Sequence, residues 1–169
     1  MNFPRAVAMI VVLVTAALVE TVLLAEVTLS GVTPPLVLLT VAGFGLSEGP
    51  GVGLRYGFAA GLLVDLLSGG LVGLSALVYL VGGYLAGISR PYLSGTELIG
   101  QLTVGAAVCG GGILGYSMLT VLFDPGQMTI TEVFLATLAA AFFGGVLTPV
   151  VIKPIAALCA RLDLLFGAR

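Results

Sequence analysis

The chain has 169 residues, of which 59% are hydrophobic and only 8% are charged, and its formal net charge is −2. A soluble domain is usually about 25% charged, so this chain lacks the ionised groups that a water-facing surface needs. We therefore expect an all-α integral membrane protein whose surface meets the lipid bilayer. The basic residues are not clustered, which excludes a nucleic-acid binder.

The first hydrophobic segment, residues 6–27, follows a single basic residue, Arg5, and could be mistaken for a secretory signal. Its apolar run from Ala6 to Leu24 is long enough to cross about 30 Å of hydrocarbon. The run also lacks a clean small-x-small cleavage site. We expect an uncleaved first membrane helix.

Five further hydrophobic segments follow, separated by turn-forming residues. They are expected at 34–46, 53–67, 71–88, 98–123 and 130–152, after the breaks SGVTPP, SEGPG, SGG, SRPYLSGT and DPG. Helices are expected because a helix satisfies its own backbone hydrogen bonds in lipid. The sequence thus predicts a single membrane domain, 1–169, with six transmembrane helices in a compact bundle.

The basic residues predict the orientation of these helices. With six spans, all of them fall on one side of the membrane: Arg5, Arg55, Arg90, Lys153, Arg161 and Arg169. The three opposite loops contain no Lys or Arg. Because cytoplasmic loops are enriched in Lys and Arg, both termini are expected in the cytoplasm.

The tail after the sixth segment, residues 155–166, carries apolar residues at helical spacing. They are Ile155, Leu158, Cys159, Leu162, Leu165 and Phe166. This pattern is typical of a short amphipathic helix lying in the inner membrane interface. A cytoplasmic extension of the sixth helix fits the same pattern equally well.

Residues with catalytic or metal-binding chemistry are scarce. The chain has no histidine, the commonest general base and a frequent metal ligand. Cys109 and Cys159 are far apart without metal-ligand spacing, so we expect packing residues, with a structural disulfide as the alternative. No P-loop or HExxH motif is present. We therefore expect no enzyme activity, no metal and no cofactor.

Glycines recur at four-residue spacing on the third segment. Gly53, Gly57 and Gly61 precede Asp65 in a GxxxGxxxGxxxD pattern, and residues at this spacing form one stripe along a helix. Small residues allow two helix backbones to approach closely. Pairs on the fourth and fifth segments repeat the spacing: Gly83 with Gly87, and Gly111 with Gly115. Internal packing and contact with a second membrane protein both explain these glycines.

Asp65 is the notable charge within the hydrophobic segments. A carboxylate in hydrocarbon costs about 2.5–3.5 kcal/mol at a helix centre on insertion scales, so it should face protein or water. Three roles are open: accepting hydrogen bonds from the SGG turn or a neighbouring helix, binding a cation or polar solute, or catalysis with Glu20 as the second acid.

The stretch GFAAGLLVDLLSGGLVGLSALVYLVGGYLAG, residues 57–87, resembles the MreD family of bacterial rod shape-determining proteins. The family pattern GxxxGxxxDxxSGxxxG falls on Gly57, Gly61, Asp65, Ser68, Gly69 and Gly73. Pro34 or Pro35 before the second segment, and Pro149 near the end of the last, agree more weakly. The candidate structural or partner-contact residues are thus Gly53, Gly57, Gly61, Asp65, Ser68, Gly69, Gly70, Gly73, Pro34 and Pro149.

The resemblance implies a non-enzymatic scaffold of the cell-wall elongation machinery in the bacterial inner membrane. It implies binding to an MreC-like bitopic protein, and indirect links to the MreB filament, a transpeptidase and a SEDS-type glycosyltransferase. It also implies a fold similar to the substrate-binding component of energy-coupling-factor vitamin transporters. For that reason a small-solute transporter is the alternative function.

Overall fold

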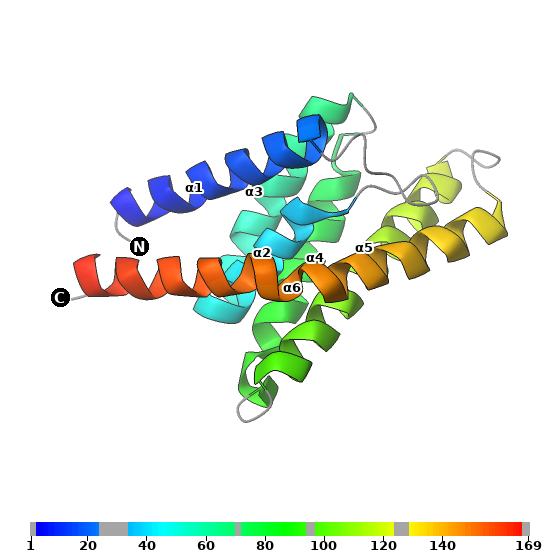
Figure 1. Ribbon diagram of the computed structural model, residues 1–169. Helices are drawn as coiled ribbons and strands as arrows, with labels where there is room; N and C mark the ends of the chain where they lie inside the picture. The colour runs from blue at the N-terminus through cyan, green and yellow to red at the C-terminus, as the bar shows by residue number, and fades with distance from the viewer. Residues whose placement is uncertain (1–2, 24–33, 70–71, 94–96, 124–128, 167–169) are drawn as a thin grey trace.

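The computed structural model describes residues 3–23, 34–69, 72–93, 97–123 and 129–166 of the chain (Figure 1). Within these ranges every regular element is a helix. They are α1 (Phe3–Leu18), which continues as a π-helical turn (Val19–Leu23), α2 (Leu36–Glu48), α3 (Pro50–Ser68), α4 (Leu74–Ser89), followed by a 3-10 turn (Arg90–Leu93), α5 (Glu97–Phe123) and α6 (Ile130–Phe166). The all-α class is therefore confirmed for the described part of the chain.

Helix α2 lies at the centre of the molecule. It contacts α1, α3, α4, α5 and α6, and every residue from Val37 to Leu46 is buried. A helix that is apolar on all sides is stable only when other elements surround it. Its 13 residues cover about 20 Å, which is less than the hydrocarbon thickness of about 30 Å. The shortness of α2 therefore suits a helix that is enclosed by its neighbours.

Three helices in the described ranges are long and apolar enough to cross a membrane. They are Pro50–Ser68, Ile99–Leu122 and Ile130–Leu162, and two shorter apolar helices cover Ala6–Val22 and Leu36–Glu48. These lengths support a membrane protein. The arrangement with six spans remains a prediction.

Helix α6 continues through the tail predicted at 155–166. The sequence left two alternatives for this tail, a short amphipathic helix in the membrane interface or an extension of the sixth helix, and α6 runs unbroken for 37 residues through Pro149 and Pro154. Prolines are tolerated inside apolar helices where neighbouring groups compensate for the lost backbone hydrogen bond. Beyond Pro154, Ile155 is buried and lies against Gly43 of α2. Packing on the bundle therefore carries the helix onward, so the tail agrees with the extension of the sixth helix and not with a separate helix.

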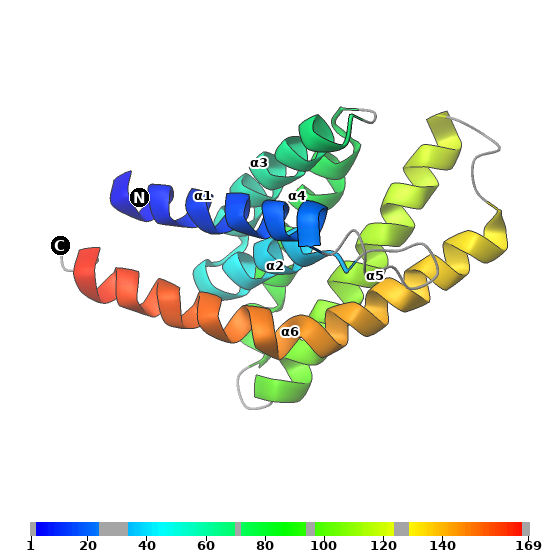
Figure 2. The same ribbon diagram turned by 45° about the horizontal axis from the view of Figure 1, so that its top comes forward.

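The long helices also set the overall shape. Helices α5 and α6 cross where a Cβ on Gly144 would lie 2.6 Å from the carbonyl oxygen of Gly105. From this crossing, the end of α5 and the start of α6 diverge from each other (Figure 2). In both views the start of α1 and the end of α6 lie at the same end of the molecule.

Candidate functional site

The glycine stripe of α3 packs directly against α4. A Cβ on Gly53 would collide with the carbonyl group of Gly83, and one on Gly57 would collide with the carbonyl group of Tyr79. One on Gly61 would collide with the backbone of Ala76. The two backbones therefore approach each other closely along the length of the stripe, as small residues allow. Internal packing occupies these three glycines.

Asp65 continues the same stripe and reaches the first turn of α4. It is 4% exposed, and its carboxylate accepts three backbone N–H groups. Gly73 donates to Oδ2 at 2.7 Å, Ser75 donates to Oδ1 at 3.2 Å, and Ala76 donates to Oδ2 at 3.4 Å. The first N–H groups of a helix lack partners within that helix, and its dipole favours a negative charge there. Asp65 therefore caps α4 from a neighbouring helix.

The turn between α3 and α4 depends on the same residue. The backbone N–H of Gly69 donates to the backbone carbonyl of Asp65 at 3.1 Å and closes the end of α3. Gly69 has φ 65° and Gly73 has φ 108°, both in the left-handed region that favours glycine. Asp65 thus holds the end of one helix with its main chain and the start of the next with its side chain.

A second carboxylate, that of Glu20, accepts a backbone N–H at the start of α2. Glu20 lies in the π-helical turn after α1, and its Oε2 accepts the backbone N–H of Val37 at 2.7 Å. Two prolines, Pro34 and Pro35, precede α2 and have no N–H group of their own. Sequence reasoning treated Glu20 only as a possible second acid for catalysis. The sequence signal for this contact is an acidic residue within one apolar segment, together with two prolines directly before the next segment.

Among the described residues, the other polar and reactive groups form no cluster of a catalytic or metal-binding kind. Buried threonines bond within their own helices, as Thr40 does to the carbonyl of Leu36 at 2.8 Å. Cys109 and Cys159 are both buried and are not joined in a disulfide, so the disulfide alternative is wrong. In the described ranges, no three Asp, Glu, Cys or His side chains come together as metal ligands would.

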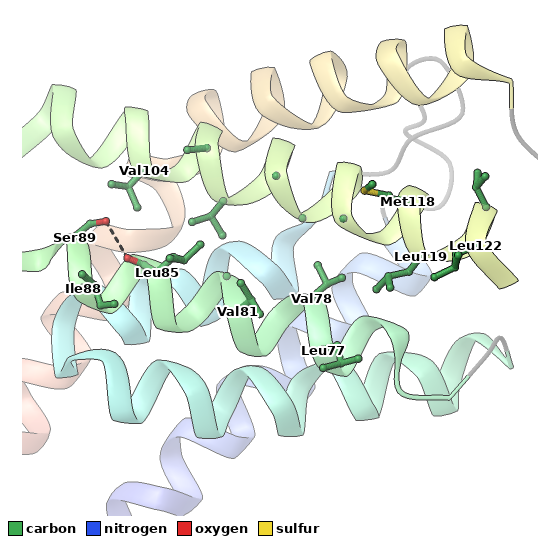
Figure 3. A pocket seen from close by; sticks show the side chains of 17 residues that line it. Leu77, Val78, Val81, Leu85, Ile88, Ser89, Val104, Met118, Leu119 and Leu122 are labelled. Atoms are coloured by element: carbon green, nitrogen blue, oxygen red, sulfur yellow. Dashed lines mark hydrogen bonds between the residues drawn. The ribbon is translucent and has the colours of Figure 1, made fainter.

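A large apolar groove runs between α4 and α5 (Figure 3). It has a volume of about 1200 Å³ and is lined by residues from Leu77 to Ser89 on α4 and from Val104 to Leu122 on α5. Ser89 is the one residue in this lining with a polar side chain, and its hydroxyl donates to the carbonyl of Leu85 at 2.9 Å. The groove therefore offers a hydrophobic surface without free polar side chains.

Comparison with known proteins supplies the family. A family model described as rod shape-determining protein MreD matches residues 1–159. The chain belongs to the MreD family. No curated protein and no solved structure matches it. The expected likeness to a transporter component therefore has no support from known structures.

The remaining residues of the MreD-like pattern lie around the turn. Ser68 is exposed at the end of α3, Gly69 follows it, and Gly70 lies outside the described residues. Pro34, ahead of α2, is buried, and its carbonyl accepts the N–H of Leu36 at 2.9 Å. Pro149 lies inside α6 and is half-buried. These residues of the pattern thus gather at the turn between α3 and α4, whereas Pro34 lies before α2 and Pro149 lies within α6.

Proposed function

We propose that this chain is a non-enzymatic membrane scaffold of the bacterial cell-wall elongation machinery. In this role it maintains rod shape by binding an MreC-like bitopic protein. The proposed indirect partners are the MreB filament, a SEDS glycosyltransferase and a transpeptidase of peptidoglycan synthesis. Membership of a family that determines rod shape supports the general role.

The main support for the scaffold proposal is the role of two carboxylates, those of Asp65 and Glu20. Asp65 and Glu20 both accept backbone N–H groups at helix starts. A catalytic or ion-binding carboxylate needs free lone pairs directed at a substrate or ligand. Both oxygens of Asp65 and Oε2 of Glu20 are used in this way. This use suits a chain that holds a shape and presents surfaces to other proteins.

The proposed location is the inner membrane, with several spans and both termini in the cytoplasm. Arg55, Arg90, Lys153 and Arg161 are all exposed, as cytoplasmic charges should be. The first helix begins and the last helix ends at one end of the molecule, which suits an even number of spans (Figures 1 and 2).

The alternative is a substrate-binding membrane component of a vitamin-type transporter. Small-molecule sites use a few well-placed polar groups for orientation and specificity. The α4–α5 groove lacks them, since its one polar side chain, Ser89, is bonded to its own helix. A co-purified small molecule and a neighbouring gene for an energising subunit would favour the transporter instead.

Co-purification tests the scaffold proposal. The full-length chain and the full-length MreC-like protein of the same genome are co-expressed, and the chain is captured through a terminal tag in mild detergent. We expect the MreC-like protein in the eluate at a constant ratio. No association while both proteins are folded would refute the proposal.

A further inference from the structure

We infer that the groove between α4 and α5 is the docking site for one membrane-spanning α-helix of a partner protein. This inference rests on the proposed scaffold function and adds the place of contact and the chemistry of the contacting segment.

The groove is a fixed feature of the fold because α2 keeps its walls apart. Leu38 of α2 is buried beneath both walls. A Cβ on Gly82 of α4 would lie 3.0 Å from Cδ1 of Leu38, and one on Gly112 of α5 would collide with its Cδ2. Leu38 thus fills the space that these two glycines leave. An occupant meets a preformed groove, which lowers the cost of ordering on binding.

The length of the groove selects an occupant that crosses both leaflets. At the rise of an α-helix the lining extends for about 18 Å on α4, from Leu77 to Ser89, and for about 27 Å on α5, from Val104 to Leu122. The longer wall is close to a hydrocarbon thickness of about 30 Å. One lipid acyl chain covers only one leaflet, about half of that thickness. A transmembrane helix covers all of it.

The lining and the shape exclude two other occupants. A polar solute would need hydrogen-bonding groups, and the lining has no free polar side chain. A second copy bound through a two-fold axis would place the same concave surface opposite itself. Two grooves facing each other leave a void, whereas a convex helix fills one groove.

The wall of α5 is open where a partner backbone would approach. Nothing lies within 4 Å of a Cβ built on Gly111, and the nearest atom to one on Gly115 is 3.8 Å away. The stripe of α3 is different, because Gly57 and Gly61 are already in contact with α4. The expected partner segment is an uncharged apolar helix with small residues facing Gly111 and Gly115, and large aliphatic residues facing Val81 and Leu85.

Photo-cross-linking locates the contact in the intact complex. A photoreactive phenylalanine analogue replaces Leu85 or Met118 in the groove, or Leu138 or Phe142 on the exposed face of α6 as matched controls. The probe is the co-expressed full-length MreC-like protein. We expect cross-links to its membrane helix from the two groove positions only. Cross-links from α6 only, to lipid only, or to a second copy of this chain overturn the docking site.

Filling the groove gives an independent readout. Gly111→Phe has space for its Cβ and is expected to fold, and to lower the recovered partner by about tenfold or more, which corresponds to about 1.4 kcal/mol of binding free energy. Ala59→Phe places the same side chain on the exposed face of α3 and should leave recovery unchanged. Normal recovery with Gly111→Phe overturns the docking site but leaves the proposed function intact. No recovery with the unaltered chain overturns both.

Discussion

The carboxylate of Asp65 and the backbone N–H of Gly73 are joined by a hydrogen bond of 2.7 Å between Oδ2 and nitrogen. The aspartate belongs to α3, and the glycine lies directly before α4. This contact gives the GxxxGxxxGxxxD pattern a physical meaning. Its glycines bring two helices close enough for a short side chain to reach the backbone of the neighbouring helix. The aspartate then caps the helix that the glycines have brought near.

Replacing Asp65 should lower the stability of the bundle. Asp65→Leu removes the acceptor of buried backbone N–H groups, at a cost of about 1–3 kcal/mol for each group left unsatisfied. Asp65→Asn keeps one acceptor oxygen and should be milder. Thermal unfolding in mild detergent measures both. Leu66→Ala, at an exposed neighbour, should stay within about 0.5 kcal/mol of the unaltered chain.

Normal stability of both Asp65 variants would contradict the capping role. If both Asp65 variants unfold like the unaltered chain and assemble normally with the partner but lose a bound solute, the carboxylate is a ligand group. The capping interpretation would then be wrong.

Replacing Glu20 should also lower the stability of the protein, because its side chain accepts a backbone N–H at the start of α2. Glu20→Leu leaves the N–H of Val37 without its acceptor and should destabilise the protein by about 1–3 kcal/mol. Glu20→Gln preserves an acceptor oxygen and should retain most of the stability. Val22→Ala, an exposed position on the same turn, is the matched control for these unfolding measurements. Equal stability of Glu20→Leu and Glu20→Gln would contradict the cap.

Much of the helical pattern could be predicted from local signals. Glycine and proline breaks placed the fifth segment at 98–123, and α5 covers Glu97–Phe123. The third segment was expected from residue 53, whereas α3 begins at Pro50, since proline suits the first position of a helix. The position of Asp65 on the glycine stripe also followed from spacing alone.

Contacts between distant segments could not be predicted in this way. Glu20 and Val37 are 17 residues apart, and no periodicity links them. The pairs Gly83–Gly87 and Gly111–Gly115 have identical spacing, yet the first pair contacts the backbone of neighbouring segments, whereas the second lies at the groove. Only the three-dimensional packing separates the two cases, because α3 packs against Gly83 and Gly87 of α4, whereas no backbone packs against Gly111 and Gly115 of α5.

Gly57 faces the backbone of α4, whereas Gly111 faces open space, so adding one methyl group should have opposite effects at the two positions. Gly57→Ala forces α3 away from the carbonyl of Tyr79 and should cost about 1–3 kcal/mol, as overpacking does. Gly111→Ala meets open space and should be neutral, or stabilise α5 by up to about 1 kcal/mol because alanine favours helix. Thermal unfolding of the isolated chain compares the two variants. Equal losses would show that Gly111 is also used for internal packing.

The second half of α6 should depend on its packing against α2. Ile155 is 5% exposed and lies against Gly43, so Ile155→Ala should leave a cavity and cost about 2–5 kcal/mol of unfolding free energy. Val150→Ala on the same helix is the control, because Val150 is 71% exposed and its truncation leaves no cavity. A helix that rested only on the membrane interface would instead lose membrane affinity without a change in bundle stability. Unfolding measurements in detergent, where no bilayer interface exists, therefore distinguish packing on α2 from attachment to the lipid surface.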